Sequence, residues 1–384
     1  MENTLNDYIK STVDNRGRNP EQYYENEKYP VIDNVLIKNS LYPDLSEVNR
    51  YIDQETYDNF LRGYVHKNMP LITLVGNGIG NVTLAPSDKV VIVQNTIGFE
   101  VNDNADEIFL FYYLLCNQER IRQFNRGSGQ PSIKKTDILN MAVDFPSLQN
   151  QRKIASVLLS IDKKIENNKE KVKNLYSQAR LLYKSWFLDF DNNKGVMPSE
   201  WHFGKVSEII ELHDSLRKPL SGSERENLEK IYPYYGATSI MDYVDDYLFD
   251  GKYLLLGEDG SVMDSEGYPI LQYVFGKFWV NNHAHVITGK NGFSVEMLYL
   301  LFSLTHINDI VTGAVQLKIS QQNLKKVEVV IPDVDTLAYF DEIIQPLFTG
   351  IRHIYAENEN LVEMKNTIMP KLMAGELNVE RIPE

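Results

Sequence analysis

Two long stretches of the chain carry apolar residues at alternating spacings of four and three. They cover residues 154–186 and 340–372. This spacing predicts an amphipathic helix with a heptad seam in each stretch. The first seam is interrupted by Asn168 and the second by Asn358, so each predicted helix carries a polar residue on its apolar face. Pro346 lies inside the second seam and predicts a break or kink there.

The two seams lie 186 residues apart, and the sequence before each of them is related at the same offset. The matched positions are Gly127, Gln130, Ile133 and Pro146 with Gly313, Gln316, Ile319 and Pro332. No gap is required from Asn95, which aligns with Asn281, onward to Pro146. Further upstream, residues 74–78 resemble residues 255–260 only after a small insertion. The chain is therefore predicted to contain two copies of one unit, each a globule followed by a long helix.

Short apolar runs before each long helix predict strands, and longer periodic segments predict shorter helices. The predicted strands are 71–75, 89–94, 252–256, 270–275 and 325–331, and the predicted shorter helices are 107–124 and 294–308. Residues 191–200 are polar with Gly and Pro, which indicates a linker. The expected domains are a first globule over 1–146, a central helix over 147–190, this linker, a second globule over 201–332, and a C-terminal helix and tail over 333–384.

A repeat of this kind favours a pseudo-twofold arrangement in which the two helices pair antiparallel. Antiparallel pairing places Asn168 opposite Asn358, where the two amides can satisfy each other and set the register. Charge favours the same pairing. Residues 149–190 carry nine Lys/Arg and four Asp/Glu, whereas residues 335–376 carry three Lys/Arg and seven Asp/Glu. The alternative is two amphipathic helices that pack separately on their own globules. The expected fold class is α/β (α+β), with two mixed domains joined by an antiparallel coiled coil.

Composition narrows the class of protein. A chain of 384 residues that is 43% hydrophobic is long enough for two domains. Its one cysteine, Cys116, excludes a disulfide framework and a cysteine-based zinc cluster. The start MENTLNDYIK predicts no signal peptide, and no apolar run approaches a membrane span, so we expect a cytoplasmic protein without a membrane partner. The net charge of -14 argues against coating nucleic acid by bulk charge, but not against a local basic surface.

Three helical segments carry recognisable motifs: residues 145–154 read FPSLQNQRKI, residues 184–190 read KSWFLDF and residues 369–377 read MPKLMAGEL. With these motifs the chain resembles the specificity (S) subunit of type I restriction–modification enzymes. The first segment is similar to the family's Pro-Pro-Leu-x-Glu-Gln-x-x-Ile, with Asn150 in place of the usual Glu, and the other two are similar to the ends of that family's two helices. Residues 333–340 (DVDTLAYF) lack the Glu-Gln pair, so the two partner contacts are expected to be unequal. The resemblance covers nearly the whole chain.

This resemblance implies a non-catalytic subunit that recognises double-stranded DNA with a split target. Each globule is then a target recognition domain for one half of the sequence, and the paired helices fix the gap between the halves. The implied protein partners are two methyltransferase (M) subunits and the restriction/translocase (R) subunits. The ten seam positions cover 32 residues, or roughly 48 Å of helix, which is enough to separate two recognition domains by about one to one and a half DNA turns.

Motifs for catalysis are missing from the sequence. There is no phosphate-binding Gly-x-x-x-x-Gly-Lys-Ser/Thr loop and no Asp/Asn-Pro-Pro-Tyr/Phe element, so we expect neither a motor nor a methyltransferase, and no cofactor. Residues 76–80 (GNGIG) predict a tight β-turn rather than a dinucleotide-binding loop. His283 and His285 lack further nearby metal ligands, so we expect no metal and instead interpret them as polar residues that face DNA. Cys116 lies in an apolar helix, which indicates a core position.

The candidate DNA contacts lie in basic, glycine-containing stretches, where a glycine lets the backbone approach a phosphate and a glutamine can recognise adenine. For each residue the alternative is a solvated basic face. The candidate DNA-binding residues are Asn15, Arg16, Arg18, Arg126, Ser128, Gln130, Lys134 and Lys135 in the first half, and Gln316, Lys318, Lys325 and Lys326 in the second.

Three functions are consistent with the sequence. The leading hypothesis is a DNA specificity subunit that also scaffolds methyltransferase and restriction subunits. The alternative is a two-domain helical scaffold that binds only protein partners. The third, an enzyme with an unrecognised site, is disfavoured by the missing motifs.

Overall fold

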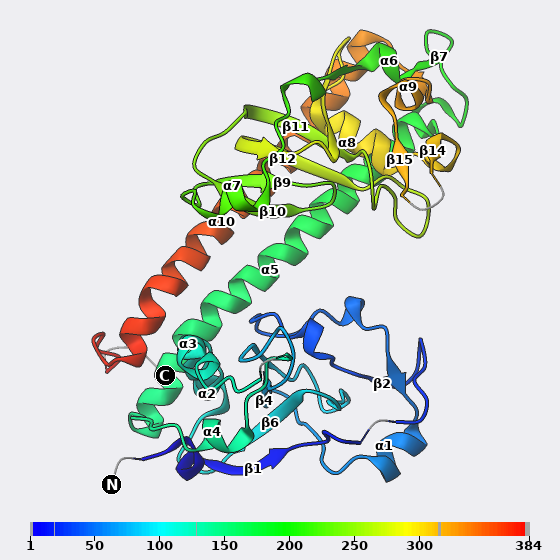
Figure 1. Cartoon of the computed structure of the whole chain (residues 1–384). Helices are drawn as coiled ribbons and strands as arrows, with labels where there is room; N and C mark the ends of the chain where they lie inside the picture. Colours follow the sequence, from blue (N-terminus) through cyan, green and yellow to red (C-terminus); the bar gives the residue numbers. More distant parts are fainter. Residues whose placement is uncertain (1–2, 19, 128, 314–315, 381–384) are drawn as a thin grey trace. The chain divides into compact units, whose positions relative to one another are not determined.

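The computed structural model describes residues 3–18, 20–127, 129–313 and 316–380. The chain divides into two compact units (Figure 1). The first unit consists of Met1–Asn168 and Glu357–Glu384, and the second consists of Lys169–Ala356. Each unit therefore contains one mixed α/β globule and one half of each long helix, which confirms the predicted fold class.

The two heptad seams form the two longest helices, α5 (Leu148–Phe187) and α10 (Val334–Met373). Both have 40 residues, and they begin 186 residues apart. Each helix is amphipathic, so its apolar stripe faces protein while the remaining surface is polar. Within the described part of the chain, no helix is both long and apolar enough to cross a membrane.

The break predicted at Pro346 does not occur, because α10 continues through this residue. A proline in a helix interior removes one backbone hydrogen bond. The residues on either side compensate, since Ile344 and Phe348 are both fully buried in the core of the second unit. Packing of the apolar stripe thus outweighs the local cost of the proline.

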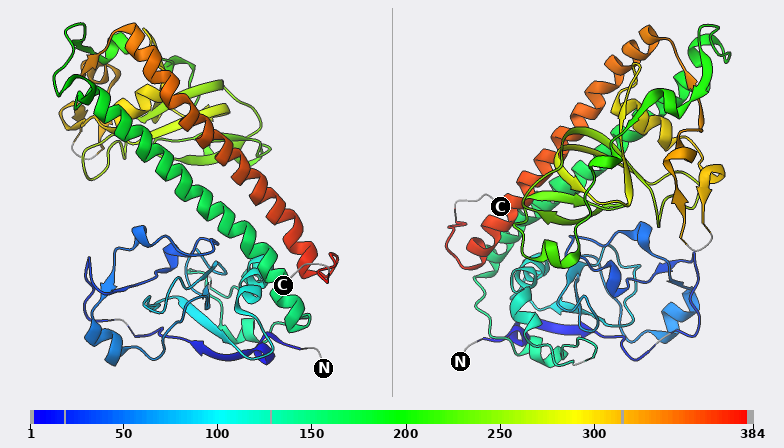
Figure 2. Two further views of the ribbon diagram at one scale, coloured as in Figure 1. Left: turned by 180° about the vertical axis from the view of Figure 1, so that it is seen from behind. Right: turned by 45° about the horizontal axis from the view of Figure 1, so that its top comes forward.

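Within each unit the halves of α5 and α10 lie side by side and run antiparallel (Figure 2). In the first unit, Lys153 of α5 contacts Glu380 just beyond α10, and Asp162 contacts Lys365. In the second unit, the ring of Tyr176 meets Phe348, and the ring of Tyr183 meets Phe340. Along α5 from Lys153 to Tyr183, the residue numbers of the partners in and after α10 fall from 380 to 340. This order confirms the antiparallel pairing and excludes two separately packed helices.

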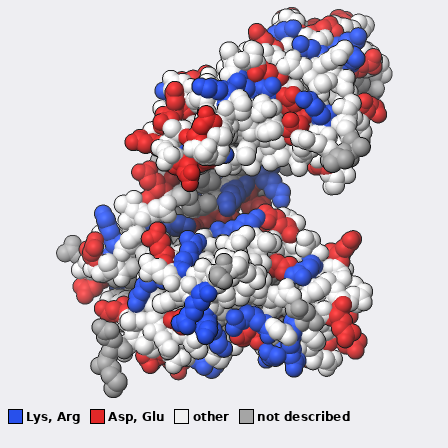
Figure 3. Space-filling model, in the orientation of Figure 1, with Lys and Arg blue, Asp and Glu red and all other residues white. Residues whose placement is uncertain are grey.

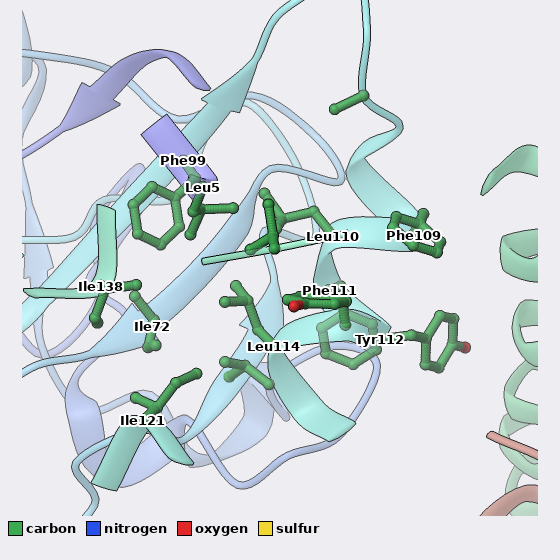
Figure 4. Close-up of a cluster of buried hydrophobic side chains, with 14 of the residues drawn as sticks. Leu5, Ile72, Phe99, Phe109, Leu110, Phe111, Tyr112, Leu114, Ile121 and Ile138 are labelled. Atoms are coloured by element: carbon green, nitrogen blue, oxygen red, sulfur yellow. The ribbon is translucent and has the colours of Figure 1, made fainter. Parts of the chain in front are cut away.

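The globule of the first unit is built on a four-stranded sheet in the order β1-β6-β4-β5. Helix α2 packs its apolar residues against this sheet, and Figure 4 shows Leu110 and Leu114 pointing toward Phe99 and Ile72. The strands are β1 (Ile9–Val13), β2 (Tyr29–Pro30), β3 (Tyr51–Ile52), β4 (Pro70–Thr73), β5 (Val82–Leu84) and β6 (Thr96–Val101), and the helices are α1 (Gln54–Phe60), α2 (Glu107–Cys116), α3 (Gln118–Arg122) and α4 (Lys135–Leu139).

Two predicted elements of the first globule differ from the structure. The predicted strand 89–94 is an extended, buried segment with a single bridge between Val31 and Val91. Pro30 precedes that bridge, and a proline has no N–H with which to continue the ladder. The predicted helix 107–124 is split at Asn117, whose side-chain Nδ2 donates to the carbonyl of Tyr113 at 2.9 Å.

The globule of the second unit is built on a six-stranded sheet in the order β10-β9-β12-β11-β13-β8. The predicted strands 252–256 and 270–275 lie in the two long central strands, β11 and β12. The strands are β7 (His202–Lys205), β8 (Ile210–Leu212), β9 (Tyr232–Tyr235), β10 (Ile240–Val244), β11 (Phe249–Gly257), β12 (Leu271–Val280), β13 (Ala284–Gly289), β14 (Val311–Thr312), β15 (Lys318–Ile319) and β16 (Glu328–Ile331), and the helices are α6 (Val206–Ile209), α7 (Gly222–Glu226), α8 (Val295–Ser303) and α9 (Gln321–Leu324).

Candidate nucleic-acid interface

A small hairpin occurs at the same place in both units. In the first unit the N–H of Arg126 donates to the carbonyl of Ser132 at 2.9 Å. In the second unit the residues 186 positions later, Thr312 and Lys318, pair in strands β14 and β15. The sequence repeat is therefore also a structural repeat at the segment that carries the candidates Arg126 and Gln130 in the first unit and Gln316 and Lys318 in the second.

The glycine of each hairpin is required by a close approach of the backbone. A Cβ atom on Gly127 would lie 1.8 Å from the carbonyl oxygen of Gln130. A Cβ atom on Gly313 would lie 2.1 Å from the carbonyl oxygen of Gln316. No other residue fits either position without a shift of the backbone, so the matched Gly and Gln residues specify one tight turn in both copies.

In each unit the hairpin accepts a backbone hydrogen bond from another turn that contains a glycine. The N–H of Gly76 donates to the carbonyl of Pro131 at 2.9 Å, and the N–H of Gly260 donates to the carbonyl of Leu317 at 2.9 Å. These bonds make Gly76 of the first unit the equivalent of Gly260 in the second. The two glycines are 184 positions apart and the hairpins are 186 apart, so the small insertion in the alignment lies between the glycine turn and the hairpin. Residues 76–80 form a turn between the antiparallel strands β4 and β5, as predicted.

The gapless alignment between the copies is wrong near Asn95. The N–H of Leu74 donates to the carbonyl of Asn95, and the equivalent bond in the second unit runs from Glu258 to His283. Asn95 therefore corresponds to His283 rather than to Asn281. A slip of two residues in the strand leaves the apolar pattern unchanged, which is why the sequence did not reveal it.

The basic candidates of the first hairpin gather around the start of α4. Gln130 and Lys134 are exposed, and the ammonium of Lys134 has no partner among the described residues. The guanidinium of Arg126 donates to Asp137 at 2.8 Å. The ammonium of Lys135 donates to the hydroxyl of Thr12 at 3.2 Å. Ser128, the remaining candidate of this hairpin, lies outside the described residues.

Arg16 is brought to the same place through Asp14. Its guanidinium donates to both carboxylate oxygens of Asp14 at 2.8 Å, and the ammonium of Lys135 lies 3.6 Å from one of them. The hydrogen bond from Arg16 holds the pKa of Asp14 below its usual range, although burial opposes this shift. The carboxylate thus joins two candidate cations and neutralises part of their charge.

The other two candidates of that stretch do not join the cluster. Asn15 is 1% exposed, and its amide is fully used inside the fold. It donates to the carbonyls of Gly63 and Ile92 and accepts from the N–H groups of Arg62 and Gly63. This contradicts its assignment as a DNA contact, because no polar atom is left for a base or phosphate. Arg18 is exposed and donates to the carbonyl of Phe60 at 2.9 Å.

In the second unit the four candidates are all exposed. Gln316 and Lys318 lie on the hairpin, and the ammonium of Lys318 is 3.4 Å from Glu258. Lys325 and Lys326 follow α9, at the far end of that short helix from the hairpin. The second unit therefore also combines a hairpin cation with a carboxylate.

A buried network beneath this hairpin was not found by sequence reasoning. His285 is fully buried, which corrects the interpretation that it faces DNA. Its Nδ1 lies 2.6 Å from Asp214 Oδ2, and its Nε2 lies 2.8 Å from the carbonyl oxygen of Ile319 in β15. His283 is partly exposed and pairs with Asp259 at 2.5 Å. The pattern His-x-His marked the strand, but Asp214 is 71 positions away and gave no signal.

Asp214, Glu258 and His285 lie close enough together to be considered as metal ligands, since their ligand atoms are within 4.8 Å of one another. Their ligand atoms already have other partners. The guanidinium of Arg217 donates to Glu258 at 2.7 Å and lies 3.5 Å from Asp214. Since a cationic side chain occupies the space between the carboxylates, the cluster fits an ion-pair network better than a metal centre.

The two seam asparagines meet in the first unit. Nδ2 of Asn168 donates to Oδ1 of Asn358 at 2.9 Å and to Glu357 at 2.7 Å. The reciprocal bond from Asn358 is not formed, and Oδ1 of Asn168 has no hydrogen-bond partner within the described parts of the chain. The structure thus brings the residues together as expected, but one hydrogen bond joins them in place of two, and it uses the NH2 group of Asn168 and the carbonyl of Asn358.

Charge is mixed on the surface of both units. On the face shown in Figure 3, basic and acidic side chains are interspersed within each unit rather than gathered into one continuous basic field. Carboxylates also lie beside Arg16, Arg126 and Lys318, so the charge of these candidate cations is partly neutralised in both units.

Comparison with known proteins gives one consistent family. The family described as "Type I restriction modification DNA specificity domain" matches residues 2–175 and 198–351. A putative type I restriction enzyme specificity subunit of Haemophilus influenzae is 32% identical over 149 residues, covering 39% of this chain but only 38% of that relative. The MjaIX type I restriction enzyme specificity subunit of Methanocaldococcus jannaschii is 25% identical over 338 residues, covering 78% of this chain and 77% of the relative.

The fold agrees with this family. The crystal structure of a type I restriction–modification S subunit from M. genitalium matches with a TM-score of 0.58 at 17% identity, covering 97% of this chain and 95% of that one. The two matched segments of the family fall on the two globules, each followed into its long helix. The chain therefore belongs to the family of type I restriction–modification DNA specificity domains and contains two copies of that domain.

Proposed function

We propose that this chain is the non-catalytic specificity subunit of a type I restriction–modification enzyme and recognises a split target in double-stranded DNA. The observation that carries the proposal is the repeated hairpin, with the same glycine turn and the same backbone bonds in both units. Each hairpin presents a glutamine and nearby cations at its surface, which suits contact with bases and phosphates. Residues 1–146 and 201–332 are the two proposed recognition domains.

The helical segments 147–190 and 333–384 are the proposed spacer between these domains, and the linker 191–200 leads from the first segment to the second domain. An α-helix of 40 residues is roughly 60 Å long. We assign Asn168 and Asn358 the role of fixing the register of the spacer, because a buried polar pair disfavours shifted alignments of two helices. A fixed register gives a fixed gap between the two halves of the DNA target.

The same helices are the proposed platform for two methyltransferase subunits, to which restriction/translocase subunits are added. Support comes from a cavity of about 350 Å³ beside the start of α5 and one of about 530 Å³ beside the start of α10. Four lining positions of these cavities are repeat equivalents: Asn150, Leu372, Asn378 and Val379 in the first, and Thr336, Trp186, Asn192 and Asn193 in the second. The second cavity also contains Trp201, so the two partner contacts are expected to differ in strength.

The decisive experiment is to express the chain with its methyltransferase subunits and map methylated adenines in the host genome. We expect methylation at sites with two short defined blocks separated by a spacer of constant length. Methylation or footprinting without sequence preference would refute the proposal. If the complex assembles but shows no preference, the chain is a scaffold for protein partners only.

Neutralising the first hairpin tests its role directly. Replacing Lys134 and Lys135 by alanine should weaken binding of the methyltransferase complex to all DNA sequences, because these cations are proposed to contact phosphates. The slope of log affinity against log salt should fall by about two. The matched control removes two exposed lysines elsewhere in the same unit, Lys10 and Lys38, and should leave the slope unchanged. Equal effects of both double substitutions would remove this hairpin from the interface.

A further inference from the structure

The hairpin of the second unit, formed by β14 and β15, contacts one buried side chain of the sheet. His285 of β13 is 0% exposed, and its Nε2 lies 2.8 Å from the carbonyl oxygen of Ile319 in β15. Ile319 directly follows Lys318, the cation that this hairpin presents at the surface. The position of the exposed side chain therefore depends on the contact made by the buried one.

Both ring nitrogens of His285 face hydrogen-bond acceptors. Nε2 lies 2.8 Å from the carbonyl oxygen of Ile319, which can only accept a hydrogen bond, and Nδ1 lies 2.6 Å from Asp214 Oδ2. Burial alone would raise the pKa of Asp214, but hydrogen bonds from His285 and from the N–H of Val286 hold this pKa below its usual value.

The same network extends to both ends of the recognition strand. Nε2 of Gln321, at the start of α9, donates to Asp214 at 2.5 Å. Arg217 donates to Glu258 at 2.7 Å, and the other oxygen of Glu258 lies 3.4 Å from the ammonium of Lys318. One network thus contacts the exposed cation Lys318 itself and the chain that follows it, at Ile319 and Gln321.

The first unit builds the same hairpin without a histidine at this place. The residue of β6 that corresponds to His285 is Ile97, which is also 0% exposed. The first unit keeps a carboxylate, since Asp14 follows β1 as Asp214 follows β8, but Asp14 pairs with Arg16 and Lys135 instead of a buried ring. Ile133, the equivalent of Ile319, still donates its N–H to the carbonyl of Leu74 at 2.8 Å, just as Ile319 donates to the carbonyl of Glu258 at 2.8 Å. The hairpin fold therefore does not require a buried histidine, and a buried His–Asp contact present in one copy only points to a requirement of that copy's function.

We propose that His285, paired with Asp214, is the positioning residue of the second recognition domain and sets its base preference. It acts through Ile319 and Glu258, which place Lys318 and the start of α9 against the DNA. This inference rests on the proposed function and adds to it a specificity-determining residue outside the DNA-contacting surface.

The test uses the complete complex of the chain with its methyltransferase subunits and duplexes in which one half of the mapped target is scrambled at a time. His285→Gln replaces the two ring nitrogens by one amide nitrogen, which donates, and one amide oxygen, which only accepts. Asp214→Asn keeps the shape of its side chain but removes the charge that holds the ring. Both variants should lose about tenfold discrimination at one half of the target and keep discrimination at the other half.

A second buried charge in the same unit provides the control. Glu296 is 0% exposed and accepts from Lys252 and Tyr273, away from the hairpin. Glu296→Gln should lower the stability of the unit in urea without changing either half-site preference. If His285→Gln lowers stability and leaves both preferences intact, or if Glu296→Gln changes preference equally, the inference is wrong. Absence of any preference in the unaltered complex would instead refute the proposed function.

Discussion

Replacing Lys365 by methionine should lower the free energy of unfolding by about 3–5 kcal/mol. The ammonium of Lys365 in α10 donates to Asp162 of α5 at 2.7 Å, and both side chains are almost fully buried, at 14% and 8% exposure. The substitution leaves a buried carboxylate without its counter-charge, which costs more than the pair itself contributes. Urea unfolding of the chain measures the loss. Since the total free energy of unfolding of a native protein is about 5–15 kcal/mol, this loss of stability is large.

Two further variants separate burial of the charge from loss of a contact. Lys164 pairs with Glu357 at 3.1 Å in the same helix pair, but both side chains are about half exposed. Lys164→Met should therefore change stability by less than about 1 kcal/mol. Adding Asp162→Asn to Lys365→Met should recover most of the loss, because the amide is neutral and still accepts from Tyr112. A loss of under about 1 kcal/mol for Lys365→Met alone would show that Asp162 is hydrated rather than desolvated.

Asp162 also fastens the globule to the helices. The hydroxyl of Tyr112 in α2 donates to it at 2.7 Å. Burial, and then the neighbouring carboxylate, raise the pKa of Tyr112, so its hydroxyl remains a donor at neutral pH. A single carboxylate thus joins α2, α5 and α10 within the first unit. The first hairpin belongs to the same globule, so this contact determines how firmly that globule is held on its part of the two helices.

The heptad spacing was sufficient to predict the long helices, because a stripe of apolar residues on a helix has few alternative uses. The same spacing placed Asn168 opposite Asn358, because the register of an antiparallel pair determines which seam residues face each other. The partner of Lys365 was not predictable in this way. Asp162 lies beside the seam rather than in it, and its second contact comes from Tyr112, which is 50 positions earlier in the chain.

The candidate interface was predictable only where the repeat marked it. Gly127 with Gln130, and Gly313 with Gln316, were matched in sequence because one backbone geometry requires them in both copies. Asn15 was misassigned, since a short polar side chain in a turn-like stretch has the same local pattern whether it faces solvent or closes a buried loop. The ion pairs beneath the second hairpin join elements that are far apart in sequence, so no local pattern contains them.

The two units have different residues at the helix position that contacts the globule. The residue 186 positions after Asp162 is Phe348, so the second unit has an aromatic ring where the first has a carboxylate. The ring centroid of Phe348 lies 5.2 Å from that of Tyr273, 5.8 Å from that of Tyr176 and 6.1 Å from that of Tyr299. These residues belong to β12, α5 and α8. The same junction is thus polar in one copy and apolar in the other.

Phe348→Ala should therefore be as damaging in the second unit as Lys365→Met is in the first, with a loss of about 3–5 kcal/mol in urea unfolding. The ring is 0% exposed, so its removal leaves a cavity that α10 cannot close without moving away from the sheet. Phe348→Leu keeps most of the apolar volume and should cost less than half as much. If the alanine variant loses under about 1 kcal/mol, the aromatic cluster is not what holds this globule on its helices. The polar contact of Arg352 with Glu296 and Tyr273 would then be the principal joint of the second unit.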